Sequence, residues 1–422
     1  MSYASKIKEK KFAWGGTALS SAFPAHGRIS IVGSVSGGTR LSGNRALAEA
    51  HAAMLLEGTT KHDKTAIQIL LDDLGASLSF AVEKDRLVFD GHVRAIYGKK
   101  LLALIAEVLR EPSFPKAEFA HLKERMRAEY ALEAQNTRAQ AGINLSQLLY
   151  PSIHPNFQPS TADSLAALEA LTRSDLAAYH AHAIDRRSLV VSIAGDIEKD
   201  VSFALVQTCF AKLPQSDREL PFSVTTPPHS ACARSVRIED KASIDYMLGI
   251  ATGVTKDNPD YPALLLGLQV LGNRGGFTGR LMKTVREIEG LTYGVYAYLA
   301  GFLNADGYIV AWATFAPELY EKGKAALMRE IRSIVKDGAT NDEVKKHRTM
   351  FEARSRVMLS NSGDLARAAH DIAIEGRKPS YIDEFPHRVL KITRAQVNIA
   401  LKKYLVVADL SESAAGPVAG SA

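Results

Sequence analysis

One pattern of residues occurs twice along this chain of 422 residues, and this repetition limits the possible folds more than any other feature of the sequence. Leu-Thr-Arg-Ser-Asp-Leu around Thr172 resembles Ile-Thr-Arg-Ala-Gln-Val around Thr393, 221 positions later. A second pair of similar segments contains Glu118 and Glu343, which lie 225 positions apart. Two similar offsets indicate that one unit is used twice. We therefore predict two homologous domains.

A polar, proline-rich segment separates the two copies. Residues 214–231 contain four prolines and show no regular spacing of apolar side chains, which is typical of a linker. We therefore place an N-terminal domain at residues 1–213, a linker at 214–231 and a C-terminal domain at 232–422. The length of the chain also favours more than one domain.

Within each half, the spacing of apolar residues changes between the periods of strands and of helices. Leu87, Phe89 and Val93 alternate with polar residues, which predicts a half-buried strand. Further strands are predicted at residues 28–35, 188–194, 244–251, 293–300 and 308–315, and helices at 99–110, 116–141, 174–183, 262–271, 318–336 and 342–359. Long helices that follow a hairpin favour an α+β fold, so we expect in each domain an antiparallel-rich sheet with helices covering one face.

The composition excludes several classes of function. The chain has 52 basic and 46 acidic side chains and no dense basic run, so a nucleic-acid partner is not indicated. Its two cysteines, Cys209 and Cys232, cannot form a disulfide framework or a cysteine-rich metal site. No stretch has the apolar length of a membrane span. We expect a soluble protein, cytoplasmic as the sequence stands, or periplasmic if a leader has been removed.

An alanine-rich helix that ends at Gly58 carries the first family resemblance. Residues 46–59 read Ala-Leu-Ala-Glu-Ala-His-Ala-Ala-Met-Leu-Leu-Glu-Gly-Thr. They resemble the zinc-binding helix of the pitrilysin, insulinase and mitochondrial-processing-peptidase family, whose signature is His-x-x-Glu-His followed by Met-Leu and Gly-Thr. In this alignment Glu49 occupies the place of the first histidine, Ala52 that of the general-base glutamate and Ala53 that of the second histidine.

The residues at these three positions cannot form the family's metal site. The chemistry needs three functional side chains on one helical face, where residues three and four apart are neighbours. Alanine can neither bind zinc nor activate a water molecule, so we expect no metal in this chain. His51 lies two residues from position 49 and points about 200° around the helix. We expect His51 to be a packed or partly exposed helix residue.

Two other candidate ligands have more than one interpretation. The family's last zinc ligand is a glutamate on a later helix, and Glu129 lies 80 positions after Glu49, a matching separation. Glu129 is either a relic of that ligand or, as we favour, a surface residue of a charged helix. His180 and His182 form an H-x-H pattern, and we expect both at a helix surface because residues two apart diverge.

The second resemblance covers residues 272–298. There, a glycine-rich turn leads into Arg-Glu-x-x-Gly-Leu-x-Tyr and then into a strand, which is similar to the best-defined segment of the family's second domain. The resemblance implies that Arg286 and Tyr293 help to hold the substrate near the zinc of the opposite domain. Gly290 is a natural helix C-cap that lets the chain reverse. A guanidinium and a phenol both donate to a peptide carbonyl oxygen, which suits this role.

Two alternatives for this segment are weaker. By spacing alone, a helical arginine is usually a solvated charge and a strand tyrosine is usually packing, but the match extends over 20 consecutive residues. A phosphate-binding loop does not fit, because the glycines follow an apolar helix and do not form G-x-x-x-x-G-K-[ST]. The glycines concerned are Gly272, Gly275, Gly276 and Gly279.

Taken together, the resemblance covers most of residues 28–405 and implies a division of labour between two chains. This chain would be the non-catalytic, substrate-binding subunit of a heterodimeric zinc metalloendopeptidase that cleaves peptides or unfolded segments. Its partner would be a homologous subunit with an intact His-x-x-Glu-His motif, which would hold the zinc. One alternative is a structural or interaction protein on the same fold. An autonomous enzyme with an unrecognised site is the least favoured interpretation.

Overall fold

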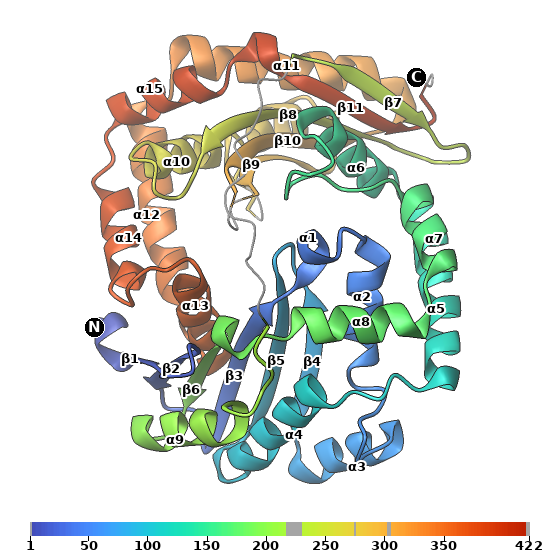
Figure 1. Cartoon of the computed structure of the whole chain (residues 1–422). Coiled ribbons are helices and arrows are strands. Elements are labelled where there is room, and N and C mark those ends of the chain that lie inside the picture. Colours follow the sequence, from blue (N-terminus) through green and yellow to red (C-terminus); the bar gives the residue numbers. More distant parts are fainter. Residues whose placement is uncertain (1, 217–229, 274–275, 302–304, 419–422) are drawn as a thin grey trace. The chain divides into compact units, whose positions relative to one another are not determined.

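The computed structural model describes residues 2–216, 230–273, 276–301 and 305–418. Its strands form two sheets, visible as two groups of arrows in Figure 1. The strands of the first sheet are β1 (Ile7–Lys11), β2 (Thr17–Ala22), β3 (Arg28–Ser36), β4 (Ser77–Val82), β5 (Arg86–Arg94) and β6 (Val190–Gly195). Those of the second sheet are β7 (Ala233–Arg237), β8 (Ile244–Val254), β9 (Val295–Ala300), β10 (Gly307–Phe315) and β11 (Ser411–Gly416).

The two sheets have the same topology. The first has the order β1-β2-β6-β3-β5-β4 and the second the order β7-β11-β8-β10-β9. One pairing in each sheet is parallel, β2 with β6 and β7 with β11, and the other pairings are antiparallel. If β1 is set aside, both sheets place their strands in the order first, fifth, second, fourth, third. The α+β fold with two similar, antiparallel-rich sheets is therefore confirmed.

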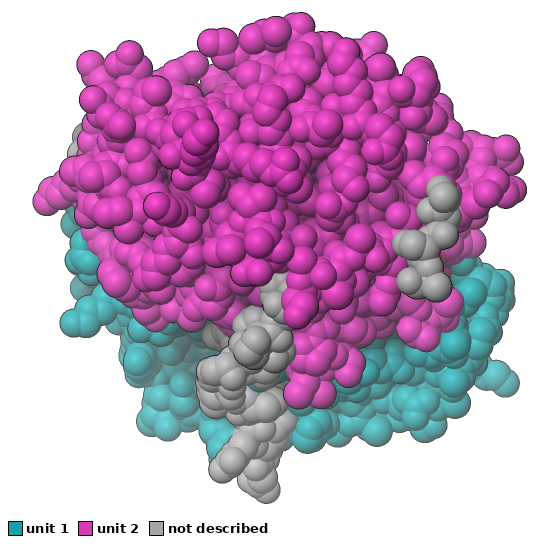
Figure 2. Space-filling model, turned by 90° about the horizontal axis from the view of Figure 1, so that it is seen from above, with its two compact units in different colours: residues 1–128, 164–221, 354–386 teal, residues 129–163, 222–353, 387–422 magenta. Residues whose placement is uncertain are grey.

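The compact units of the structure do not coincide with the two halves of the sequence. One unit comprises residues 1–128, 164–221 and 354–386, and the other comprises residues 129–163, 222–353 and 387–422 (Figure 2). Each unit thus combines the sheet of one half with a helical segment of the other half. The domain limits at residues 213 and 232 remain a prediction about the sequence repeat, and most of the predicted linker lies outside the described residues.

Helices complete both units. The unit with the first sheet contains α1 (Gly38–Ser42), α2 (Arg45–Met54), α3 (Lys64–Leu74), α4 (Gly98–Arg110), α8 (Arg173–Ala183), α9 (Lys199–Phe210) and α13 (Ser362–Ile374). The unit with the second sheet contains α6 (Thr137–Leu149), α10 (Tyr261–Gly272), the π-helical segment η4 (Met282–Ile288), α11 (Tyr320–Asp337) and α15 (Arg394–Tyr404). The unit limits fall inside α5 (Lys116–Ala134), α7 (Thr161–Ala170), α12 (Asn341–Val357) and α14 (Tyr381–Leu390).

The exchanged segments carry the helices α6 and α13, and each covers one face of a sheet from the other half of the sequence. α6 packs against β8 and β11, and α13 packs against β3 and β6 (Figure 1). Leu145 of α6 belongs to a core cluster with Met247 and Trp312. Leu365 of α13 belongs to the corresponding cluster with Val32. Apolar burial of this kind stabilises a fold by about 25 cal/mol per Å².

The exchanged helices α6 and α13 begin after two equivalent asparagines. The prediction of one helix over residues 116–141 is wrong, because α5 ends at Ala134 and a new helix follows. The Asn136 side chain caps α6 by accepting a hydrogen bond from the Ala139 amide at 3.0 Å. Asn361, 225 positions later, caps α13 by accepting one from the Asp364 amide at 2.9 Å. Asparagine is among the best N-cap residues because its short side chain reaches the free amides of the first turn.

The repeated threonine motif also has a local structural role. Thr172 caps α8, and Asp175 accepts a hydrogen bond from the Thr172 amide in return. Thr393 and Gln396 form the same reciprocal arrangement at the start of α15. Such a capping box satisfies two backbone donors that the helix itself leaves free. The motif that reveals the duplication is therefore a helix start, followed in each half by the last strand of its sheet.

A buried chain of hydrogen bonds fixes α13 on the first sheet. The Arg86 guanidinium donates to the Ser34 hydroxyl, which lies 2.7 Å from His370 Nε2, and His370 Nδ1 lies 3.0 Å from the Asp371 carboxylate. Because the carboxylate can only accept, Nδ1 carries the ring hydrogen and Ser34 donates to Nε2. Burial lowers the pKa of His370, which keeps the ring neutral as this chain of donors requires.

Helices also cover the second face of each sheet. β3 is buried along Ile29–Ser36, as expected of a strand with both faces covered. Gly98 of α4 packs closely on Ile29 of β3, since a Cβ atom at Gly98 would lie 2.7 Å from the Ile29 side chain. Ile29 and Ser34 lie on opposite faces of the strand because side chains alternate. In the second unit, Phe315 of β10 lies in the same way against Gly323 of α11. The predicted helical cover is thus present, and the exchanged helices add the second layer.

The approach of α10 to β9 gives a test of this packing. A Cβ atom on Gly272 would lie 2.0 Å from the Ala297 backbone nitrogen, so Gly272→Ala should destabilise the protein by about 1–3 kcal/mol in urea unfolding. Gly142→Ala in α6 is the matched control, since its Cβ would meet only Met247 at an ordinary 3.8 Å. That change should stabilise by about 0.5–1 kcal/mol, because alanine favours a helix interior. Equal stability of the two variants would contradict the packing described here.

Candidate functional site

The helix α2 contains Glu49, Ala52 and Ala53, the positions that the resemblance assigns to the family's zinc helix. It begins after Asn44, whose side chain accepts a hydrogen bond from the Leu47 amide at 3.1 Å. Glu49 forms an ion pair with Arg45, one turn earlier, at 2.8 Å. Ala52 is buried, with 6% of its surface exposed, and Ala53 is half-buried. Two of the three positions therefore carry only a methyl group, and the third carries a carboxylate that is paired with a guanidinium.

The surroundings of α2 do not supply a substitute set of ligands. Within residues 2–216, 230–273, 276–301 and 305–418, no group of three or more His, Cys, Asp or Glu side chains is arranged to hold a metal ion. Zinc sites in proteins use three or four such ligands. Glu129 is exposed on α5, and it belongs to the second unit whereas α2 belongs to the first.

His51 is a buried residue at the contact between α2 and α8. Its Nε2 atom lies 2.9 Å from His180 Nδ1, and one of these two nitrogens carries the hydrogen of the bond between them. The edge of the Tyr179 ring meets His51 at a centroid distance of 5.0 Å, and Phe114 lies 5.9 Å away. The Tyr179 hydroxyl donates to the Gly38 carbonyl at 3.1 Å, which anchors the cluster to the start of α1.

These contacts decide the two predictions about histidines. His51 is packed, with 1% of its surface exposed. The prediction that His180 lies at the surface is wrong, because α8 turns this face toward α2 and leaves only 9% of His180 exposed. His182, two residues further on, is exposed. Helical spacing correctly predicts that two residues two positions apart point in different directions. It does not show which of the two faces a neighbouring helix.

Burial sets the charge state of the histidine pair. It lowers the pKa of His51 well below its ordinary value, and the neighbouring His180 lowers it further. It also lowers the pKa of His180 to about 4. Both rings are therefore neutral near pH 7, so that one nitrogen can donate and the other accept. The pair joins α2 to α8 without a metal ion.

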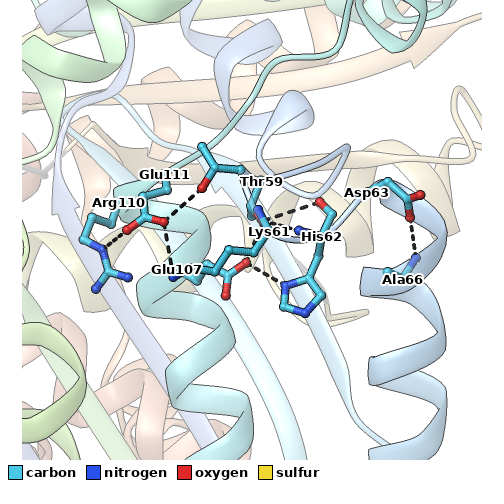
Figure 3. A network of polar contacts seen from close by, with 9 residues as sticks. Thr59, Lys61, His62, Asp63, Ala66, Glu107, Arg110 and Glu111 are labelled. Carbon is cyan, nitrogen blue, oxygen red and sulfur yellow. Dashed lines mark hydrogen bonds and ion pairs between the residues drawn. The ribbon is translucent and has the colours of Figure 1, made fainter.

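The segment after α2 is held by a polar network (Figure 3). The Thr59 hydroxyl donates to Glu107 of α4 at 2.6 Å, and it accepts hydrogen bonds from the amides of Lys61 and His62 at 3.1 and 2.9 Å. The His62 side chain also donates to Glu107, at 2.8 Å. Burial would raise the pKa of Glu107, but the hydrogen bonds from Thr59 and His62 outweigh it, and the pKa lies below its ordinary value.

The glycine of the Gly-Thr pair has a separate structural reason. Gly58 has a φ of +151°, a backbone conformation that residues with a side chain rarely adopt. Its carbonyl accepts a hydrogen bond from the Ser113 amide at 3.0 Å, which links the segment to the chain that follows α4. In this chain the Gly-Thr pair fixes the exit of α2, and that role requires no metal.

The second candidate segment, residues 280–294, lies in the other unit. Arg286 lies on the π-helical segment η4, and this rare form of helix is often found at functional sites. η4 ends in an αL cap: Gly290 has a φ of +63°, and its amide donates to the Arg286 carbonyl at 3.2 Å. The Leu291 amide donates to the Val285 carbonyl at 2.9 Å. Gly290 therefore reverses the chain as the sequence predicted.

The chain after the cap is tied to β10. The Thr292 hydroxyl donates to the Thr314 carbonyl and accepts a hydrogen bond from the Gly294 amide at 3.1 Å. A Cβ atom on Gly294 would lie 2.9 Å from the Trp312 ring, so this position also lies close to the sheet. Between these two anchored residues, the Tyr293 side chain points outward and is 93% exposed.

The side chain of Arg286 lies against an aromatic ring that the sequence analysis did not single out. Its guanidinium carbon is 4.9 Å from the centre of the Phe277 ring, within the range of a cation–π interaction. Phe277 itself is 72% exposed. A large aromatic residue inside a glycine-rich turn could have indicated it. Direct contact between Arg286 and Tyr293 is not required for either residue to face a ligand, and their roles in substrate binding remain a prediction.

No helix among the described residues is long and apolar enough to cross a membrane.

The histidine pair leads to a pH-dependent prediction. The folded pKa of His180 lies below the unfolded value of about 6.5, so the unfolded state binds more protons as the pH falls below 6.5. His180 alone should cost on the order of 2 kcal/mol of stability between pH 6.5 and pH 5. Urea unfolding at pH 5 and pH 7.5 measures this loss. The double variant His51→Leu, His180→Leu should lose clearly less than the wild type, and an equal loss would contradict a neutral pair.

The network in Figure 3 leads to a second prediction. Thr59→Val keeps the shape of the side chain but removes the hydroxyl from Glu107 and from two backbone amides, so it should destabilise the protein by about 1–3 kcal/mol. Thermal unfolding of Thr60→Val serves as the control. Thr60 is exposed and its hydroxyl contacts only Glu111, at 3.0 Å, so this change should stay within about 0.5 kcal/mol. Equal effects would mean that Thr59 does not organise the segment.

Comparisons with known proteins agree with this geometry. Residues 32–151 match the family profile described as Insulinase (Peptidase family M16), and residues 170–351 match the profile described as Peptidase M16 inactive domain. A Helicobacter pylori protein described as a non-peptidase homologue is 21% identical over 367 residues, 86% of this chain and 83% of its own length. An uncharacterised zinc protease of Mycobacterium leprae is 22% identical over 373 residues, 87% of this chain and 81% of its own.

Solved structures share the fold over the whole chain. The crystal structure of a peptidase M16 inactive domain from Pseudomonas fluorescens is 26% identical, covers 99% of both chains and has a TM-score of 0.90. A Helicobacter pylori protease with 15% identity covers 98% of this chain and 99% of its own, with a TM-score of 0.85, and shows the fold alone. The chain therefore belongs to the M16 family of peptidases.

Proposed function

We propose that this chain is the non-catalytic, substrate-binding subunit of a heterodimeric zinc metalloendopeptidase. In this proposal, Arg286 and Tyr293 hold a peptide at the zinc site of a homologous partner subunit. One observation carries the proposal: Tyr293 is exposed beside a capped turn that also carries the half-buried Arg286, whereas two of the three proposed metal positions of α2 carry only a methyl group. The chain contributes donors for a substrate and leaves the metal to the partner.

The state of α2 supports the first part of the proposal. Ala52, at the position of the general base, is buried in the unit and has no group that could move a proton. Restoring a metal site would need two histidines and a glutamate in a helix that now carries small residues, and alanine leaves no room for larger side chains without repacking. Proteolysis of the family's kind therefore needs a second chain with an intact His-x-x-Glu-His motif.

The state of the Arg/Tyr segment supports the second part. Tyr293 lies in a bend just before β9 and is 93% exposed, while its neighbours Thr292 and Gly294 are held against β10. The segment thus fixes the backbone and presents the side chain. A phenol and a guanidinium held in this way can donate to a carbonyl oxygen as it gains negative charge during hydrolysis.

An extended peptide has strand edges on which it can bind. β4 and β9 are edge strands. Within its sheet, each has a hydrogen-bonded neighbour on one side and none on the other. β9 begins at Val295, two residues after Tyr293. An added strand gains main-chain hydrogen bonds with little dependence on sequence, which suits a subunit that binds peptides or unfolded segments. Substrate recognition by this subunit would then combine backbone pairing with the Arg286 and Tyr293 donors.

The alternative is a structural or interaction protein on the same fold. One observation favours it: α2 is held by apolar packing, the His51–His180 pair and the Thr59 network, so the fold is complete without a metal. Under this alternative, Arg286 and Tyr293 would be surface residues without a ligand. The chain would then purify with an assembly that has no peptidase activity.

The test is reconstitution with a homologous chain that carries the intact zinc motif. Cleavage of a fluorogenic peptide should require both chains, and Arg286→Ala or Tyr293→Phe should lower turnover by about 10²–10³, the usual effect of losing one such donor. Arg332→Ala, an exposed arginine of α11 in the same unit, is the matched control and should leave turnover unchanged. Full activity of the Arg286 and Tyr293 variants would refute their roles. Stoichiometric zinc and unaided cleavage in the purified chain would refute the whole proposal.

A further inference from the structure

We infer that Phe277 is a specificity-determining residue of this site, which fixes the guanidinium of Arg286 and offers an apolar surface to a side chain of the bound peptide. The inference rests on the proposed function and extends it by naming the substrate class: extended peptides with a large apolar residue beside the carbonyl group that Arg286 holds. Three observations support it.

The first observation is the contact itself. The guanidinium carbon of Arg286 lies 4.9 Å from the centre of the Phe277 ring. Stacking of this kind restricts the orientation of the guanidinium plane but leaves the N–H groups at its edge free to donate. The ring therefore prepares Arg286 for a carbonyl oxygen before the peptide arrives, and less conformational freedom is lost on binding.

The second observation is the exposure of apolar side chains in this stretch. In the described part of the second unit, the exposed large apolar side chains are Leu132, Ile153, Phe277, Ile288, Tyr293, Ile399 and Val406. Three of these lie between residues 277 and 293, on both sides of Arg286. Single exposed apolar residues are common, but three of them in one short stretch that also carries a charged donor favour a binding surface.

The third observation is the way in which the backbone around Phe277 is held. The side chain of Asn273, which is 3% exposed, donates to the Thr278 hydroxyl at 2.6 Å. Arg280 forms a two-pronged ion pair with Glu343 of α12, at 2.7 and 2.8 Å, and donates to the Gly338 carbonyl at 2.7 Å. These contacts anchor the chain one residue and three residues after Phe277.

An exposed ring on an anchored backbone gains nothing for the fold, because the ring removes little apolar surface from water. The same ring can bury an apolar side chain of a ligand at low cost in conformational freedom, since aromatic residues have few rotatable bonds. Phe277 also lies in the same chain segment as the two donors of the proposed site. These features favour a platform for a substrate side chain over simple support of Arg286.

The experiment measures peptide binding by the full chain alone. Two fluorescein-labelled, 15-residue extended peptides differ only at a central position, which is leucine in one and serine in the other, and binding is followed by fluorescence anisotropy. We expect the wild type to bind the leucine peptide about tenfold more tightly. Phe277→Ala should abolish this preference, whereas Phe277→Leu should retain most of it and lower affinity for both peptides equally, because only the stacking on Arg286 is lost.

Ile153→Ala is the matched control, since Ile153 is 76% exposed in the same unit and lies outside the segment. It should leave both affinities unchanged, and thermal unfolding of all variants should match the wild type because both side chains are exposed. A preference for leucine that persists in Phe277→Ala overturns the inference about Phe277 but not the proposed function. A wild-type chain that binds neither peptide overturns the proposed function, and the inference falls with it.

Discussion

The structure depends on an exchange of helices between the two halves of the sequence. Each sheet has one face that a helix from the other half covers, α6 on the second sheet and α13 on the first. Without its helix, each sheet face would expose the apolar residues of its core cluster to water. The free energy lost would be large compared with the small net stability of a folded protein. Neither half of the sequence can therefore form its compact unit without the other. Two asparagine caps, 225 positions apart, start both exchanged helices and make the arrangement the same in each half.

Contacts between protein groups are enough to account for the position of α2. In small metal-bound domains the ion supplies much of the folding free energy. Here α2 is fixed by its buried alanines, by the contact of His51 with His180 and by the hydrogen bonds of Thr59 beyond its end. All of these contacts are satisfied by protein groups. The helix therefore keeps its place with alanine at the two positions that the resemblance assigns to the general base and to one metal ligand.

The sequence predicted the duplication, the fold class and most of the strands, because the period of apolar residues and the repeated helix start are local signals. It did not predict the break at Asn136, since a helical pattern continues on both sides and only the cap geometry ends the helix. It also placed His180 at the surface, because helical spacing does not show which face meets α2. The contact between Phe277 and Arg286 could not be predicted either, since it joins a glycine-rich turn to a π-helical segment.

The two candidate sites differ in what holds them, and this difference bears on function. Most residues of α2 are buried, so a substitution at one of those positions changes the packing of the unit. In the segment around Arg286, contacts of Thr292, Gly294 and Arg280 hold the backbone in place. The side chains of Tyr293 and Phe277 are exposed to solvent. Side chains that are held on a fixed backbone but contribute little to stability are well placed to bind a ligand. Within this one short segment, some residues fix the backbone and others face outward, and this separation favours substrate binding here over a purely structural role.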